Sequence, residues 1–195
     1  MTSISALNNI HKRGLFGDHQ GKDKNELTNV SEVKHLQIIQ IVHYKKSTLQ
    51  IASLNLDNLQ FPEVPMQVHS NKETRILWSG PSNWLLVSTK KDILNSVQKI
   101  CDDKNFAVTD LSHSRAIIEL KGSNSKEVLK KGCPINLNEF KVNNCANSIF
   151  HGITITIDMI SNDPETFRIF ALRSFGESLY HSITDACLED GYQGI

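Results

Sequence analysis

The stretch at residues 166–180, TFRIFALRSFGESLY, decides how the second half of this chain folds. Its first residues alternate at a period of two, which is typical of a β-strand with one face in a hydrophobic core. The two faces carry Phe167, Ile169 and Ala171 on one side and Phe170 and Leu172 on the other. The pattern therefore predicts a strand over residues 166–173 that is buried on at least one face.

A helix is predicted directly after this strand, from about residue 175 to residue 190. Ser174 and Glu177 have the S-x-x-E spacing of a capping box, in which each side chain bonds a backbone N–H group that the first helical turn leaves unpaired. The apolar residues that then recur at helical spacing are Leu179, Ile183, Ala186 and Cys187. The stretch thus predicts a strand that runs into a capped helix with one buried face.

A similar order of elements occurs twice along the chain, over residues of about 31–105 and 106–195. The predicted strands cover residues 36–44, 75–79, 84–89, 116–120, 148–150, 153–159 and 166–173. The predicted helices cover residues 92–104, 123–131 and 175–190. We therefore predict an α+β fold, in which a strand–helix–strands–helix unit is duplicated and mostly antiparallel sheets are covered by helices.

Residues 1–30 are polar and contain several glycines. Such a segment buries too little apolar surface to offset the entropy lost on ordering, so a flexible N-terminal tail is predicted ahead of a domain at residues 31–195. Leu15 and Phe16 form an apolar pair in this tail. We predict that this pair is a contact through which the tail anchors on a partner protein.

The charge balance limits the classes of partner. The 195 residues include 21 Lys plus Arg and 21 Asp plus Glu, so no net field attracts nucleic acid or an anionic membrane. No stretch approaches the roughly 18 consecutive apolar residues of a transmembrane helix. The N-terminal residues lack the apolar centre of a secretory signal. The sequence predicts a cytoplasmic protein with no nucleic-acid and no membrane partner.

The cysteines do not form a metal-binding or redox pattern. They lie at Cys101, Cys133, Cys145 and Cys187, and none belongs to a C-x-x-C pair. The sequence also lacks a glycine-rich phosphate loop and a dinucleotide-binding fingerprint. We therefore predict buried free thiols, no metal site and no cofactor-binding residues in this chain.

Asp110, Ser112 and His113 are the residue types of a hydrolase triad. Neighbouring side chains on an extended strand point to opposite faces, so Ser112 and His113 are not expected to converge. Instead, we predict that Asp110 or Ser112 bonds the local backbone at a strand end. No catalytic residue is predicted.

Two further residue pairs are candidates for packing or interfaces. Trp78 and Trp84 flank a turn and are expected to close a core or to fill an interface, because aromatic side chains dominate both. Arg115 and Arg173 are candidates for buried or interface ion pairs, because a planar guanidinium suits such pairs better than an ammonium group.

Four motifs, which together span roughly residues 75–190, resemble those of the sarcosine oxidase gamma subunit family. In chain order they are GPSNWLL at 80–86, DLSHSR at 110–115, KGCPINL at 131–137 and RSFGESL at 173–179. Asn136 replaces the Asp that is usual in the third motif. The resemblance implies a fold similar to the folate-binding part of the glycine cleavage T-protein, in which two such units exchange strands.

The resemblance also implies a function. It indicates a gamma subunit of a four-subunit enzyme that oxidatively demethylates sarcosine to glycine, with alpha, beta and delta subunits as partners. It implies that the partner subunits carry the FAD, FMN, NAD and tetrahydrofolate sites and that the gamma chain acts in subunit assembly and stability without catalysis. A subunit separated from its complex exposes an apolar interface, so we expect the isolated chain to self-associate.

The sequence departs from the T-protein pattern where that family places its acids, in a G-G-I-x-D-D run. The equivalent stretch here is HGITIT at 151–156, so Ile155 and Thr156 stand in the acidic positions and Asp158 lies two residues further on. An alternative function remains open, namely a small folate-binding aminomethyltransferase-like or folate-dependent maintenance protein. The run at 131–133, KGC, resembles the start of a motif in a folate-dependent maintenance protein.

Overall fold

The structure is a computed structural model that describes residues 4–195. The chain divides into two compact units, and we describe each unit by itself. Unit 1 contains the segments up to residue 34, 114–142 and 147–195, whereas unit 2 contains residues 35–113 and 143–146. Each unit therefore includes a segment that is distant from the rest of it in sequence, as the implied strand exchange requires.

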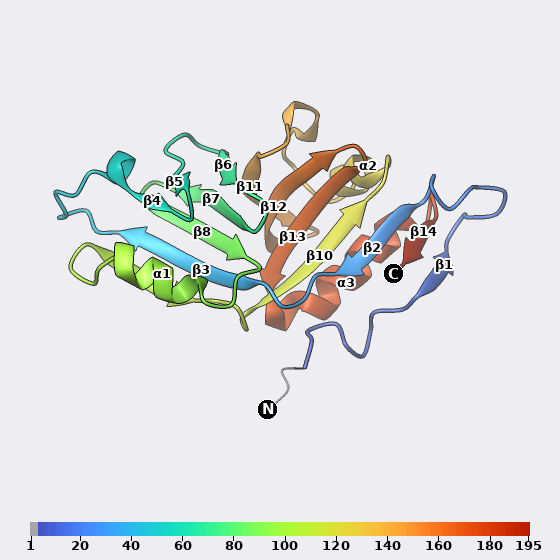
Figure 1. The fold of residues 1–195 in the computed structure, drawn as a ribbon. Coiled ribbons are helices and arrows are strands. Elements are labelled where there is room, and N and C mark those ends of the chain that lie inside the picture. The colour runs from blue at the N-terminus through green and yellow to red at the C-terminus, as the bar shows by residue number, and fades with distance from the viewer. Residues whose placement is uncertain (1–3) are drawn as a thin grey trace. The chain divides into compact units, whose positions relative to one another are not determined.

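Unit 1 is built on a seven-stranded sheet (Figure 1). Its strands, in order across the sheet, are β1 (Gly14–Phe16), β14 (Tyr192–Gly194), β2 (Thr28–Glu32), β10 (Arg115–Lys121), β13 (Glu165–Leu172), β12 (Ile153–Asn162) and β11 (Cys145–Phe150). The first residues of β11, Cys145 and Ala146, are assigned to unit 2. The pairs β1–β14, β2–β10, β10–β13 and β12–β13 are antiparallel, and β2–β14 is parallel. The strand predicted at 166–173 thus lies near the middle of this sheet.

One face of this sheet is covered by α2 (Ser125–Lys130) and α3 (Gly176–Cys187) (Figure 1). The buried side chains that β13 contributes to this face are Phe167, Ile169 and Ala171, as the period-two pattern predicts. The side chains that stand beside them in register are Ala116, Ile118 and Leu120 on β10 and Ile155, Ile157 and Met159 on β12. Three central strands and the two helices therefore form the core of unit 1.

Unit 2 is built on a five-stranded sheet in the order β6 (Val68–Ser70), β7 (Thr74–Gly80), β8 (Asn83–Ser88), β3 (Gln37–His43) and β9 (Phe106–Asp110). Helix α1 (Ile93–Ile100) packs against β3 and β9, and a short hairpin joins β4 (Asn55–Leu56) to β5 (Leu59–Gln60). The core includes Ile39, Phe61, Trp84 and Phe106. The predicted α+β class with mostly antiparallel sheets is confirmed in both units.

The boundaries of the units fall elsewhere than at residues 30 and 105, where the sequence pattern places them. They lie after residues 34 and 113, and the segment before residue 35 belongs with the C-terminal part of the chain. The reason is the pairing of β2, which bonds β10 on one side and β14 on the other. Hydrophobic periodicity reports on residues that are close in sequence, so it cannot predict strand pairing between distant segments.

The segment predicted to be a flexible tail takes part in the fold. Residues 1–3 of that prediction lie outside the described residues, but from residue 4 onwards the segment contains β1 and β2, and Leu7 and Leu27 are buried. A Cβ atom at Gly194 would collide with the carbonyl oxygen of Lys12, so glycine allows the two chain segments to approach closely. The prediction failed because it counted only local apolar residues and not the backbone pairing with β14.

The capping box is also absent from the start of α3. Ser174 lies inside a 3-10 helix, η3 (Arg173–Phe175), that leads directly into α3, and no side chain caps either helix. Instead, the backbone N–H of Arg173 donates to the carbonyl oxygen of Ser114 at 2.8 Å. The extra turn therefore moves the helix start away from the position that the S-x-x-E spacing indicates.

Candidate functional site

The end of β9 uses Asp110 and Ser112 as structural groups. The Ser112 hydroxyl donates to Asp110 Oδ1 at 2.5 Å and accepts the backbone N–H of Ile38 at 3.0 Å, while the Ser112 N–H donates to the same carboxylate oxygen at 2.9 Å. These hydrogen bonds and the charge of His113 hold the pKa of Asp110 below its usual value, against the raising effect of burial. The predicted local bonding at the strand end is confirmed, and the Ser112 hydroxyl donates to Asp110 rather than to His113.

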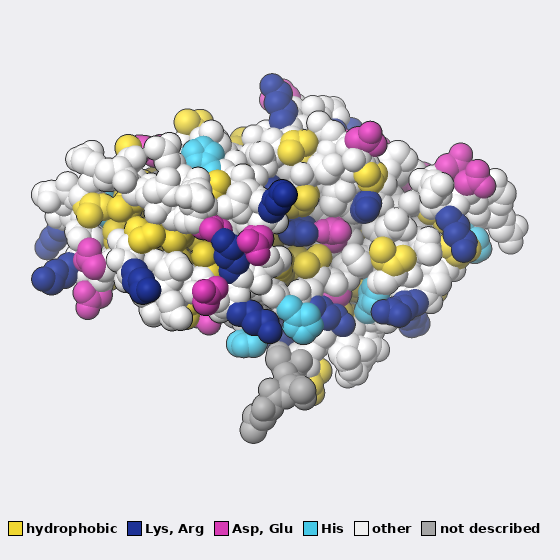
Figure 2. All heavy atoms as spheres, viewed as in Figure 1, with side chains coloured by type: hydrophobic (Ala, Val, Ile, Leu, Met, Phe, Trp, Pro, Cys, Tyr) yellow, Lys and Arg dark blue, Asp and Glu magenta, His cyan; other side chains and the backbone are white. Residues whose placement is uncertain are grey.

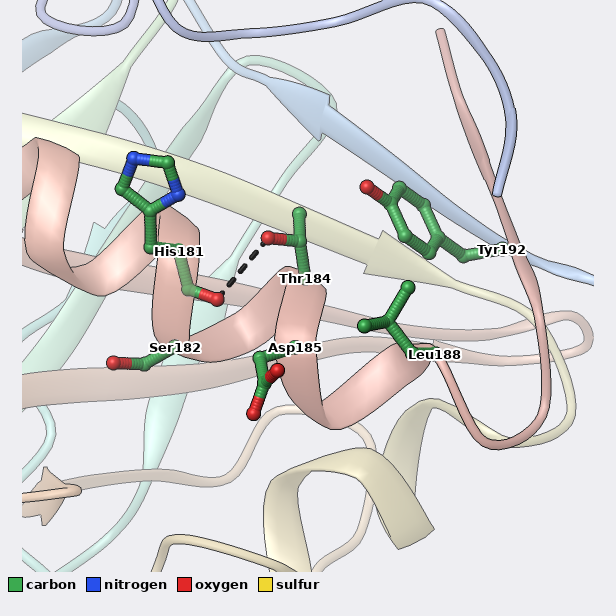
Figure 3. Close-up of a pocket in the computed structure, with 6 residues that line it drawn as sticks. All are labelled: His181, Ser182, Thr184, Asp185, Leu188 and Tyr192. Carbon is green, nitrogen blue, oxygen red and sulfur yellow. Dashed lines mark hydrogen bonds between the residues drawn. The ribbon is translucent and has the colours of Figure 1, made fainter. Parts of the chain in front are cut away.

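A cavity of about 520 Å³ lies on unit 1 where α3 meets β14, and it is lined by His181, Ser182, Thr184, Asp185, Leu188 and Tyr192 (Figure 3). Figure 3 shows that the Ser182 hydroxyl and the Asp185 carboxylate point away from the His181 ring, so these groups do not form a triad. The Thr184 hydroxyl donates within the helix, to the carbonyl oxygens of Tyr180 at 2.9 Å and His181 at 3.1 Å. The cavity therefore lacks convergent catalytic groups.

Burial perturbs Tyr192 at the edge of this cavity. Desolvation and the neighbouring Tyr180 and Cys187 raise the pKa of Tyr192 to about 12, against a smaller opposing effect of Thr184. Its ring stacks on Phe16, with ring centroids 5.1 Å apart. Tyr192 thus acts as a packing residue that holds the N-terminal segment through the half-buried Phe16, whereas Leu15 is 39% exposed. An anchor of this pair on a partner stays a prediction.

A row of charged residues crosses the other face of the sheet of unit 1. Glu119 on β10, Arg168 on β13 and Asp158 on β12 stand side by side in register. Arg168 Nε donates to Glu119 Oε2 at 2.8 Å, and Asp158 is fully buried. Figure 2 views this face, where acidic, basic and apolar side chains lie next to one another over the central strands.

The positions that carry acids in the T-protein motif are not acidic here and face in different directions. Ile155 is buried on the face that α2 and α3 cover. The Thr156 hydroxyl donates to Asn147 Oδ1 at 2.7 Å on the opposite face. These two residues supply packing and a local hydrogen bond, and neither has a carboxylate for proton transfer.

The KGC run at 131–133 forms a packed corner. A Cβ atom at Gly132 would lie 2.7 Å from the ring of His151 and 2.9 Å from that of Phe150, so only glycine fits without movement of these rings. The Cys133 thiol is buried beside the Ser148 hydroxyl at 3.2 Å. Gly132 is thus required for close packing against two rings, and its φ is not positive. This geometry gives the run a structural role.

Burial also characterises the remaining thiols. All four cysteines are free and buried, as predicted. Desolvation raises the pKa of Cys101 and of Cys187 to about 12, so neither thiol ionises readily near neutral pH. Among residues 4–195 no group of three or more His, Cys, Asp or Glu residues is placed to hold a metal ion.

The two tryptophans stand opposite each other on β7 and β8. Trp84 is 3% exposed, its Nε1–H donates to the carbonyl oxygen of Pro62 at 2.7 Å, and Phe61 contacts it edge-on at 5.1 Å between ring centroids. Trp84 therefore closes the core of unit 2, which is one of the two roles that the sequence indicated.

The two candidate arginines do not form ion pairs within the described part of the chain. Arg115 donates to the carbonyl oxygen and the hydroxyl of Ser114, at 3.4 and 3.1 Å, and Arg173 donates to the carbonyl oxygen of Ile4. Close to them, Leu172 and Phe175 are exposed. The strand pattern places Leu172 on the second face of this strand, but it predicts neither the exposure of Leu172 nor that of Phe175.

The fold places the chain in a class that solved structures share. A chain of the heterotetrameric sarcosine oxidase from Corynebacterium sp. U-96 in complex with pyrrole 2-carboxylate matches 95% of this chain and 96% of its own length, with a TM-score of 0.82 and 22% identity. Aminomethyltransferase T of the glycine cleavage system from Bartonella henselae matches 82% of this chain and 46% of its own length, with a TM-score of 0.58 and 12% identity. The class is therefore the T-protein-like α+β fold.

Sequence comparison identifies the family within this class. The model of the sarcosine oxidase gamma subunit family matches residues 48–189, and the chain belongs to that family. Sarcosine oxidase subunit gamma of Corynebacterium sp. strain U-96 is 30% identical over 119 residues, and that of strain P-1 is 27% identical over 130 residues. The matches span 60% and 65% of this chain but only 57% and 63% of these relatives.

The described helices also differ from a membrane span, because none of them meets both the length and the hydropathy that such a span requires.

Proposed function

We propose that this chain is the gamma subunit of a heterotetrameric sarcosine oxidase, and that it contributes subunit contacts rather than catalytic groups. Family membership over residues 48–189 is the observation that carries the proposal. By resemblance, the assembled enzyme demethylates sarcosine oxidatively to glycine in the cytoplasm. Its alpha, beta and delta subunits are the proposed partners.

The polar groups of the chain support a non-catalytic role. The Ser112 hydroxyl both donates and accepts a hydrogen bond within unit 2. Ile155 and Thr156 occupy the positions of the T-protein acids, so the group that would manage protons beside a bound folate is missing. We therefore propose that the FAD, FMN, NAD and tetrahydrofolate of the enzyme are held by the partner subunits.

Co-purification tests the proposal directly. The full-length chain, produced together with the alpha, beta and delta subunits, is expected to purify as a stoichiometric complex that oxidises sarcosine. Purified alone, the chain is expected to show no flavin absorbance and no sarcosine oxidation, and to self-associate. Failure to co-purify, or flavin that remains bound to the isolated chain after gel filtration, would contradict the proposal.

A reduced folate distinguishes the alternative function in the same fold class. A ligand that binds only the folded state raises its stability by mass action. Tetrahydrofolate is therefore expected to leave the melting temperature of the isolated chain unchanged, with the isolated T-protein as a positive control. A saturable increase in melting temperature would favour the folate-binding aminomethyltransferase-like or maintenance function.

A further inference from the structure

Arg115, which has no acidic partner among residues 4–195, stands beside two exposed apolar side chains in unit 1. Arg115 lies opposite Leu172 in the antiparallel register, so both side chains lie on the sheet face that α2 and α3 leave open. Phe175 follows three residues after Leu172 across the 3-10 turn of η3, and residues three apart in such a turn lie on the same side. We call Arg115, Leu172 and Phe175 together the Phe175 surface.

The apolar part of this surface is conspicuously exposed. Leu172 has 46% and Phe175 has 47% of its surface exposed, while the preceding residues Phe170 and Ala171 are each 2% exposed. The chain therefore changes from core to open surface within a few residues, and it places two large apolar side chains at that point. Exposed aromatic and aliphatic side chains next to an arginine have the composition of a protein interface rather than of an ordinary surface.

The charged part of the surface lacks a counter-charge. In the described part of the chain the Arg115 guanidinium bonds only Ser114, and no carboxylate pairs with it. Burial lowers the pKa of Arg115, which shows that its charge is desolvated without an opposite charge to compensate. A carboxylate brought to this guanidinium would make a charge-assisted, bidentate hydrogen bond.

We propose that the Phe175 surface is the site at which this chain docks on another subunit of the oxidase, through a partner segment that presents a carboxylate to Arg115 and apolar side chains to Leu172 and Phe175. This inference rests on the proposed function. A second copy of this chain fits less well, because a two-fold interface presents the same surface from both sides. Each side would then bring Arg115 and Arg173 against the same two arginines, and the exposed carboxylate of Glu177, two residues beyond Phe175, lies 3.8 Å from His181 on its own helix.

Matched variants of the full complex test the site. Phe175→Ser and Arg115→Glu are each expected to weaken the binding of the chain to the other subunits by at least about tenfold, as the loss of an interface hot spot does. Leu188→Ser is the control for the first variant, because Leu188 is 44% exposed at the other end of α3. Arg13→Glu is the control for the second, because Arg13 is exposed. Both controls are expected to bind like the wild type.

A photo-cross-link gives a second reading that does not depend on a destabilised variant. A benzophenone amino acid at position 175, in the co-purified complex, is expected to attach to a different subunit, at a peptide that contains Asp or Glu next to apolar residues. Attachment to a second copy of this chain, or to no subunit, would overturn the docking site.

The results separate this inference from the proposed function. If the wild-type chain does not co-purify with the other subunits, the proposed function is wrong. If the wild type co-purifies and Phe175→Ser and Arg115→Glu co-purify equally well, only the docking site is wrong. Thermal melting of each isolated variant accompanies the binding measurement, and where a variant melts early the cross-link decides.

Discussion

Trp84 and Phe175 are large aromatic residues of two family-typical motifs, yet the structure places them in opposite environments. Trp84 is 3% exposed, with its indole N–H bonded to Pro62 in the core of unit 2. Phe175 is 47% exposed at the start of α3 in unit 1. A motif that is typical of the family can therefore stabilise the fold in one unit and, by our proposal, mediate association in the other.

Trp84→Ala gives the largest expected effect and tests the core side of this comparison. The loss of a buried tryptophan removes its transfer free energy and leaves a cavity, so the free energy of unfolding should fall by about 3–5 kcal/mol. Urea denaturation followed by circular dichroism measures the change. A loss of less than about 1 kcal/mol would mean that Trp84 is not a core residue.

Gly194→Ala tests whether backbone contacts between the terminal segments stabilise unit 1, as Trp84 stabilises unit 2. A methyl group at this position collides with the carbonyl oxygen of Lys12, so β1 must shift relative to β14. The expected cost is about 1–3 kcal/mol, the range for overpacking. At Gly21→Ala no atom lies within 4 Å of the added Cβ, but the φ of 78° is strained for alanine, so this variant measures backbone strain without a collision. A loss of stability at Gly194→Ala that is no larger than at Gly21→Ala would contradict the close approach.

Asp57→Asn tests a polar cluster of unit 2. Burial raises the pKa of Asp57, but hydrogen bonds from Lys90, Thr74 and Asn71 outweigh it and hold this pKa below the ordinary value. Because the carboxyl pKa is lower in the folded state, ionised Asp57 stabilises the fold at a pH above its unfolded-state pKa of about 3.9. This stabilisation is lost as the pH falls through the folded-state pKa. The variant should therefore be less stable than the wild type at pH 7, and the difference should shrink below about pH 4. A difference that is independent of pH would contradict this account.

Phe175→Ala has the smallest expected effect on the isolated chain. Because nearly half of the side chain is already in water, the free energy of unfolding should change by no more than about 0.5 kcal/mol, as is usual at surfaces. Guanidinium denaturation of dilute protein measures it. A loss as large as that of Trp84→Ala would show that Phe175 packs within unit 1 and would end the contrast between the two motifs.

The sequence predicted those parts of the fold that depend on local periodicity. The alternation of Phe167, Ile169 and Ala171 indicated the buried face of β13, and the sheet confirms it. The same reasoning failed for the N-terminal segment, because its order depends on pairing with residues near the other end of the chain. It failed for Ser174 because a 3-10 turn precedes α3, and a spacing rule cannot detect that turn.

For the candidate functional residues, the sequence predicted which side chains bond locally but not which are exposed. Residue types indicated that Asp110 and Ser112 bond locally, and the hydrogen bonds agree. Exposure could not be predicted in the same way, because Leu172 continues the apolar pattern of a buried strand and only the end of the sheet leaves it in water. The contact between Gly132 and His151 likewise requires the three-dimensional arrangement.

The pairing of the chain ends in unit 1 has a consequence for biosynthesis. Lys12 bonds Tyr180 across 168 residues, and His11 bonds the carbonyl oxygen of Ile195 across 184 residues. During translation β1 and β2 leave the ribosome well before β14, which pairs with both strands. Contacts of such high sequence separation slow folding, because loop closure must precede them. The nascent chain therefore carries two unpaired strand edges until β14 has emerged, and in this interval a chaperone or a partner subunit has the most to protect.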